Sequence, residues 1–110
     1  FGFKIIHCDD FQSQGTDKIA ERIRQRVGDN PLYLSIDIDV LDPAFAPGTG
    51  TPEIAGMTTR EMVQVLRGLS GLNLISADVV EVSPAYDHAE VTSLAAATIV
   101  YELTNLFAKK

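Results

Sequence analysis

The chain has 110 residues, 45% of them hydrophobic and 22% charged, which is the composition of one globular domain and excludes a disordered chain. Its formal net charge of -6 argues against nucleic acid as a partner, because no excess of cations faces a phosphate backbone. The single cysteine, Cys8, excludes an intramolecular disulfide and favours a reducing compartment, cytoplasmic or mitochondrial. No apolar stretch reaches membrane-spanning length, so no membrane partner is expected.

The first half of the chain predicts a strand, a helix and a second strand. Residues 3–8 are apolar enough for a short buried strand, in which His7 would be a hydrogen-bonded core histidine. Residues 16–27 carry apolar side chains at helical spacing, and Gly28 is typical of a helix end. Residues 32–39 then predict the second strand.

The second half repeats the alternation. Thr58 and Glu61 form a capping box, which predicts a helix running to about residue 66. Residues 72–82 predict the third strand, and a last helix is expected to begin near Asp87. The broad apolar face of that last helix comprises Ala95, Ala96, Ile99, Val100, Leu103, Leu106 and Phe107.

Strands that alternate with helices predict an α/β fold, a three-layer α/β/α arrangement around a parallel sheet. Right-handed connections between consecutive strands place their helices on one face, whereas a parallel sheet needs cover on both faces. We therefore expect further sequence or another subunit to cover the second face. The start at Phe1, without an initiator methionine, likewise suggests that residues 1–110 are part of a longer domain.

Two carboxylates, Asp37 and Asp39, stand at the end of the second predicted strand. Alternate side chains of a strand share a face, so the two acids are expected to lie together. Close carboxylates need a compensating cation, and their hard oxygens suit Mg, Ca or Mn. The pattern favours a metal site over a solvated acidic pair. Glu81 ends the third predicted strand and would reach the same rim, below a long loop at residues 41–57.

The remaining acids have simpler interpretations. Asp42 precedes a proline and is predicted to form a turn. Asp9 and Asp10 are predicted to be caps or solvated acids, and Asp78 is predicted to make a structural hydrogen bond or ion pair. His88 stays open between a base at the rim and a surface residue.

The motif SxDxDxxDP within residues 35–56, together with Asp-Val-Val-Glu-Val-Ser-Pro at residues 78–84, resembles the ureohydrolases, the arginase and agmatinase family of binuclear manganese enzymes. Residues 47–53 and 85–90 are more similar to the agmatinase branch. The resemblance implies an arginase-like fold and hydrolysis of a small cationic guanidino substrate by a manganese-bound hydroxide. Agmatine would give putrescine and urea, in a homo-oligomer that is a trimer or a hexamer.

The same resemblance implies roles for three residues. Asp37 would bridge two Mn2+ ions, Asp39 would bind one of them, and Glu81 would pair with the substrate guanidinium. The family's GGDH and DAHxD segments do not occur in this sequence, so the other ligands and the proton-shuttling histidine are expected before residue 1. No catalytic residue is therefore assigned. Ala55 stands where the family has a glycine, which would alter the loop if that position requires a positive φ.

On this interpretation residues 1–110 are the C-terminal part of a single ureohydrolase domain and are inactive alone. Two alternatives stay open. One is a truncated assembly or interaction module that keeps the fold without catalysis. The other is a Mg-dependent phosphotransferase with Asp37 as its nucleophile, although the lysine such chemistry uses is absent between Lys18 and Lys109.

Overall fold

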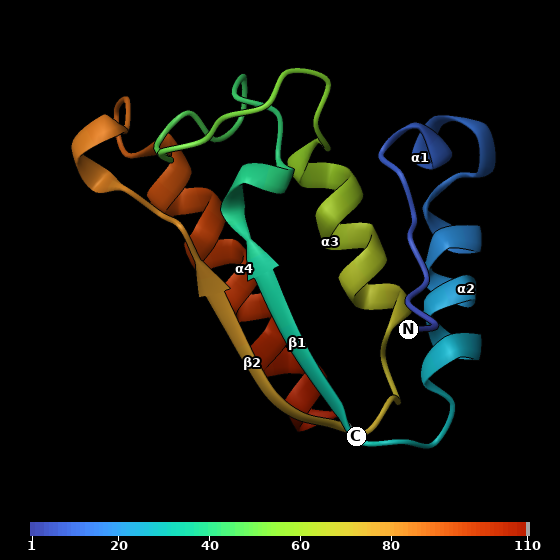
Figure 1. The fold of residues 1–110 in the computed structure, drawn as a ribbon. Coiled ribbons are helices and arrows are strands. Elements are labelled where there is room, and N and C mark those ends of the chain that lie inside the picture. The colour runs from blue at the N-terminus through green and yellow to red at the C-terminus, as the bar shows by residue number, and fades with distance from the viewer. Residues whose placement is uncertain (110) are drawn as a thin grey trace.

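The computed structural model of this chain describes residues 1–109 and shows helices and parallel strands in alternation (Figure 1), as predicted for an α/β fold. Two helices and a strand come first, and a long loop then leads to a helix, a strand and a final helix. In order, the elements are α1 (Asp9–Gln14), α2 (Thr16–Val27), β1 (Leu32–Asp37), the 3-10 helix η1 (Ile38–Val40), α3 (Thr59–Gly68), β2 (Leu74–Val80), the 3-10 helix η2 (Pro84–Tyr86) and α4 (Val91–Ala108).

Strands β1 and β2 pair in parallel, and the register places Ser35 opposite Asp78 and Asp37 opposite Val80. Helices α3 and α4 pack together against one face of this pair and bury a shared core that includes Ile36, Leu74, Leu66 and Ile99. In Figure 1 the strands lie in front of α4, and α3 lies between the sheet and α2. The helices therefore cover one face of the described sheet, as right-handed connections require.

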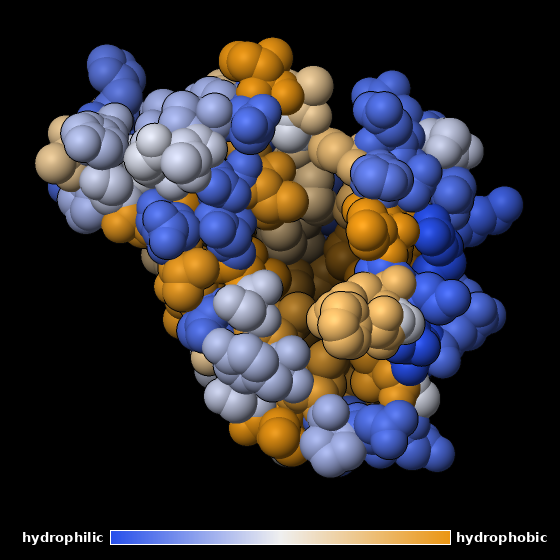
Figure 2. All heavy atoms as spheres, in the orientation of Figure 1, coloured by the Kyte–Doolittle hydropathy of each residue, from blue (hydrophilic) through white to orange (hydrophobic). Residues whose placement is uncertain are grey.

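The other face of the sheet is open. Tyr33 on β1 and Ile75 on β2 are 55% and 57% exposed. Figure 2 shows hydrophobic side chains in the hollow between the strands and α2, with hydrophilic side chains on both sides of it. A parallel strand pair with one uncovered face matches the expectation that something else covers it.

The capping signals in the sequence are confirmed. Helix α2 has the predicted bounds and ends against Gly28, whose N–H donates to the carbonyl of Arg24. Helix α3 begins with the predicted capping box, in which the Thr58 hydroxyl accepts from the N–H of Glu61 and the Glu61 carboxylate accepts from the N–H of Thr58. It continues to Gly68, slightly beyond the predicted end.

The prediction of a strand at residues 3–8 is wrong. Among residues 1–109 the sheet has two strands only, so this segment has no neighbour with which to form a ladder. Phe3 is 85% exposed, His7 is exposed rather than a core histidine, and helix α1 follows at once. An apolar pattern shows that a segment can be buried, but a strand also needs a partner for its backbone groups.

The other two predicted strands form, but both are shorter than expected. Strand β1 ends at Asp37, because the chain then winds into η1. Strand β2 begins at Leu74 instead of residue 72, because the N–H of Leu72 bonds the carbonyl of Leu69 in a turn. It ends at Val80, because Glu81 takes a left-handed conformation with φ of 70°.

Helix α4 differs from its predicted apolar face. Val100 and Phe107 are 50% and 37% exposed, whereas the charged Glu102 is 5% exposed and pairs with Arg67 at 2.8 Å. Within residues 1–109, α4 is the one helix long and apolar enough to cross a membrane by length and composition, which corrects the expectation that no such stretch exists. The helix packs against α3 and β2, and its Glu102 is paired with Arg67.

Candidate functional site

The turn after β1 brings Asp37 and Asp39 together. The N–H of Asp39 donates a 3.0 Å hydrogen bond to Oδ1 of Asp37, so Asp37 caps the 3-10 helix η1. Ile38 between them is fully buried and fixes the turn against the core. The two acids are therefore adjacent, as predicted, but through a tight turn and not through the alternation of a strand.

The strand register brings a third carboxylate near Asp37, because Asp37 pairs with Val80 and Glu81 follows Val80 directly. Partial burial is the main cause that raises the pKa of Asp37, and the charges of Asp39 and Glu81 raise it further against the opposing hydrogen bond from the Asp39 N–H. Like charges raise one another's pKa when they lie close. The structure thus places Glu81 at the rim where Asp37 and Asp39 lie, as expected for the carboxyl ends of neighbouring parallel strands.

Glu81 has a strained backbone. It follows β2 directly, its side chain is exposed, and its φ is 70°. A left-handed conformation costs a residue other than glycine roughly 1–2 kcal/mol, so it persists only where the surroundings fix it. Two residues later the N–H of Ser83 donates a 2.7 Å hydrogen bond to the carbonyl of Gly48, which holds this end of β2 against the loop.

Thr51 is a member of the site that the sequence pattern did not identify. Its hydroxyl donates a 2.6 Å hydrogen bond to Oδ2 of Asp39. The bond joins the loop after β1 back to η1 and orients one oxygen of the candidate ligand. The run Gly-Thr-Gly-Thr-Pro marks an irregular loop, but no local rule links a threonine to a carboxylate twelve residues earlier.

Asp42 is a turn residue, as predicted. Its Oδ1 accepts from the N–H of Ala44 at 2.9 Å, and its Oδ2 accepts from the N–H groups of Ala55 and Gly56 at 3.1 and 3.2 Å. These hydrogen bonds, that from Ala44 first, lower the pKa of the Asp42 carboxyl. Asp42 therefore closes the long loop and is occupied by backbone donors.

The other acids are also structural or solvated. Asp78 accepts from the hydroxyls of Ser35, at 2.6 Å, and Tyr33, and these bonds lower its pKa. Asp10 accepts from the N–H of His7 and pairs with Arg22 at 3.4 Å. The prediction for Asp78 is confirmed, whereas Asp10 is half-buried and ion-paired, neither the cap of a helix nor a solvated acid. Asp9 is exposed, as predicted for a solvated acid. His88, which the sequence left open, is exposed, and its N–H donates to Asp87 at 2.9 Å.

Manganese needs more ligands than Asp37 and Asp39 supply. Within residues 1–109, no group of three or more His, Cys, Asp or Glu side chains is arranged to hold a metal ion. Two adjacent carboxylates still offer the hard oxygen donors that Mn2+ takes, and a cation there would compensate the repulsion that raises the pKa of Asp37. The arrangement fits part of a metal shell.

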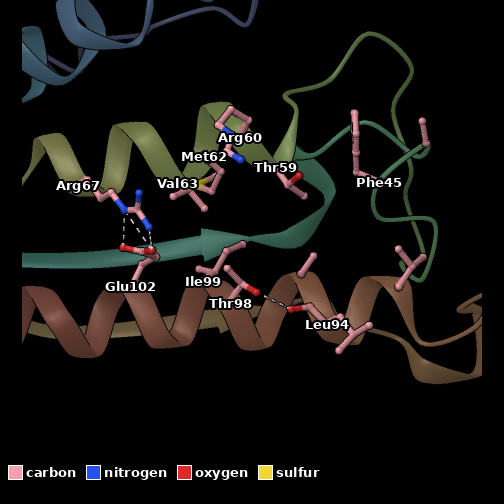
Figure 3. Close-up of a pocket in the computed structure, with 13 residues that line it drawn as sticks. Phe45, Thr59, Arg60, Met62, Val63, Arg67, Leu94, Thr98, Ile99 and Glu102 are labelled. Carbon is pink, nitrogen blue, oxygen red and sulfur yellow. Dashed lines mark hydrogen bonds and ion pairs between the residues drawn. The ribbon is translucent and has the colours of Figure 1, made fainter.

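A cavity lies elsewhere in the structure. It has a volume of about 520 Å³ between α3 and α4, and Phe45, Met62, Leu94 and Ile99 contribute to its mostly apolar lining (Figure 3). The Arg67–Glu102 ion pair closes one end. Neither carboxylate of the β1 turn lines this cavity, so it is separate from the candidate site.

The comparisons with known proteins agree with this geometry. The sequence profile described as "Arginase family" matches residues 1–105. The chain is 60% identical over 108 residues to the Schizosaccharomyces pombe protein named "Putative agmatinase 1" and 51% identical over 109 residues to the agmatinase of Photorhabdus laumondii. These alignments cover 98% and 99% of this chain but only 27% and 36% of the relatives, so the chain spans about a quarter to a third of their length.

A solved structure gives the same result for the fold. The proclavaminate amidino hydrolase of Streptomyces clavuligerus superposes with a TM-score of 0.96 at 45% sequence identity. The superposition covers 98% of this chain and 37% of that protein. The parallel strands, the rim and the long loop described above are therefore arranged as in a known amidino hydrolase.

Proposed function

Because this chain belongs to the arginase family, we propose that the protein containing it hydrolyses a guanidino compound to urea and an amine, with agmatine as substrate and putrescine as product. The observation that carries the proposal is that the hydrogen bond between Asp39 and Asp37 and the pairing of Asp37 with Val80, next to Glu81, bring three carboxylates to one rim of the sheet. Identities of 51–60% to proteins named agmatinase favour agmatine among guanidino substrates.

The chain's own residues would divide the work. Asp37 and Asp39 would hold Mn2+ ions together with ligands from outside residues 1–109, and bound manganese would activate water and stabilise developing negative charge. Thr51 would keep the Asp39 carboxylate oriented. Glu81, exposed at the same rim, would hold the guanidinium by charge-assisted hydrogen bonds, so that its central carbon faces the metals.

The substrate class follows from charge. The rim carries three carboxylates, and a cationic guanidinium compensates them whereas an anion would not. Charge does not select the part of the substrate beyond the guanidinium, since the superposed relative is named for proclavaminate and not for agmatine. Family membership also supports a homo-oligomer, a trimer or hexamer.

The test uses the full-length protein loaded with Mn2+. We expect urea and putrescine in equal amounts from agmatine, and loss of both in Asp37→Asn and Asp39→Asn together with reduced Mn content. Asp29→Asn, which removes one exposed charge before the start of β1, at the end opposite to Asp37, is the control. A folded, Mn-loaded protein that releases no urea from agmatine or another guanidino compound would contradict the proposal and favour a non-catalytic assembly module.

A further inference from the structure

One short loop, residues 47–51, joins the two parts of the candidate site. At its first glycine, the carbonyl of Gly48 accepts the 2.7 Å hydrogen bond from Ser83, two residues beyond Glu81. At its end, the hydroxyl of Thr51 donates the 2.6 Å hydrogen bond to Asp39. The position of this loop therefore affects both the guanidinium-binding side and the metal side.

The loop is fastened from behind by the start of α4. The N–H of Gly48 donates a 2.8 Å hydrogen bond to the hydroxyl of Thr92, which is fully buried. The backbone N–H of Thr92 donates a 2.9 Å hydrogen bond to Oδ1 of Asp87. Thr92 thus accepts from the loop through its buried hydroxyl and donates to Asp87 through its N–H.

Asp87 is itself fixed in place. Its oxygens accept from the N–H groups of His88, Thr92 and Ser93 at 2.9–3.0 Å and from the Ser93 hydroxyl at 3.2 Å. A Cβ on Gly48 would lie 2.9 Å from the Cβ of Asp87, so the loop backbone packs directly on this side chain. Only glycine allows that approach. Asp87 and Thr92 therefore support loop 47–51 from behind, and the loop in turn contacts both Ser83, near Glu81, and Asp39.

We propose that Thr92 and Asp87 are positioning residues, which hold loop 47–51 so that Glu81 and Asp39 keep the spacing the substrate and metals require. Neither touches the reacting groups. The left-handed backbone of Glu81 is unfavourable for a residue with a side chain. The direction of the Glu81 side chain therefore depends on the hydrogen bond between Ser83 and Gly48, two residues later. The kinetic part of this inference rests on the proposed function, whereas the structural part does not.

The chain offers a matched control, Thr49. It is 3% exposed, and its hydroxyl has no hydrogen-bond partner among residues 1–109. Thr92→Val and Thr49→Val each remove a buried threonine hydroxyl near the contact between Gly48 and Thr92. Only Thr92→Val breaks a hydrogen bond to the loop. Thr92→Ser keeps the hydroxyl and should behave like the wild type.

The first readout is amide hydrogen exchange at Gly48 and Ser83 in the full-length protein, which needs no substrate. Loss of a buried hydrogen bond should accelerate exchange about tenfold in Thr92→Val and leave it unchanged in Thr49→Val and Thr92→Ser. Equal exchange in both valine variants would overturn the proposal, whether or not the protein hydrolyses a guanidino compound. If Thr92→Val does not fold, Thr92→Ala removes the same acceptor of the Gly48 N–H and provides the same test.

The second readout separates positioning from stability. Thr92→Val should raise KM for agmatine about tenfold with a smaller effect on kcat, because Glu81 would be displaced while chemistry at the metals continues. Thr92→Ser should restore KM to within about twofold. If Thr92→Val has a lower melting temperature but the same KM as Thr49→Val, then Thr92 only stabilises the fold and does not position Glu81. Absence of urea from the wild type would contradict the proposed function. The hydrogen-exchange result would then still show whether Thr92 supports the loop.

Discussion

The carboxylate of Asp42 accepts a 3.2 Å hydrogen bond from the N–H of Gly56, fourteen residues further along the chain. Beside it, the N–H of Asp42 donates to the carbonyl of Met57 at 2.8 Å, so the two ends of the long loop are bonded to each other. A loop closed at its base moves as one piece. The contacts that orient Asp39 and anchor the end of β2 both arise within that piece, which makes its closure a determinant of the site.

Gly56→Ala should destabilise the protein by about 1–3 kcal/mol. A Cβ at this position would lie 2.6 Å from the backbone nitrogen of Asp42, and backbone atoms cannot move aside as a flexible side chain can. Thermal unfolding of the full-length protein measures the change. Gly50→Ala is the control, since its Cβ would meet nothing within 4 Å, and it should change stability by less than about 0.5 kcal/mol.

Ala55→Gly should stabilise the protein by about 0.5–1 kcal/mol. Ala55 has a φ of 67°, so the position does require the positive φ that the family's glycine provides. Removing its Cβ relieves a left-handed strain of roughly 1–2 kcal/mol, which exceeds the entropy that glycine adds to the unfolded chain. Ala44→Gly, in the same loop without a positive φ, should instead lower stability by about 0.5–1 kcal/mol. Equal shifts in both variants would contradict this account.

Asp42→Asn should destabilise the protein at neutral pH and much less in acid. The folded-state pKa of Asp42 is lowered by its backbone hydrogen bonds, so its contribution is present above the unfolded value of about 3.9 and is lost as the pH falls below it. Melting temperatures of variant and wild type should therefore differ at about pH 7 and converge towards about pH 3. Asp17→Asn controls for the loss of one charge, and a constant difference across this range would argue against the assignment.

Local signals explain the parts of the fold that were predicted correctly. The bounds of α2 and the capping box of α3 depend on residues within one turn of each helix end, and Gly28, Thr58 and Glu61 all act as expected. The strand expected at residues 3–8 depends on a partner that sequence alternation cannot specify. Its residues are exposed in the structure except for the half-buried Ile6 and Cys8, and the sheet of residues 1–109 has two strands.

The candidate site divides in the same way. Asp42 bonds the N–H of Ala44 two residues on, and this turn was predictable from Asp before Pro, whereas its bonds to Ala55 and Gly56 were not. The contacts of Thr51 with Asp39 and of Thr92 with Gly48 span 12 and 44 residues, and they exist only once the loop and α4 have packed. A pattern of residue types contains no such distances. The sequence therefore predicted the acids but not the residues that hold them.

Glu81→Gln in the full-length protein should lower kcat/KM for agmatine by about a hundredfold, chiefly through KM, because a neutral amide cannot replace a carboxylate that pairs with a guanidinium. Manganese content should stay at the wild-type value, since the metal ligands on this chain are Asp37 and Asp39 in our proposal. Glu53→Gln, which neutralises an exposed acid in the nearby loop, is the matched control and should change neither quantity. Kinetics with agmatine and metal analysis of the same preparations separate the two roles. Loss of manganese from Glu81→Gln would make Glu81 a metal ligand, and an unchanged KM would remove it from substrate binding.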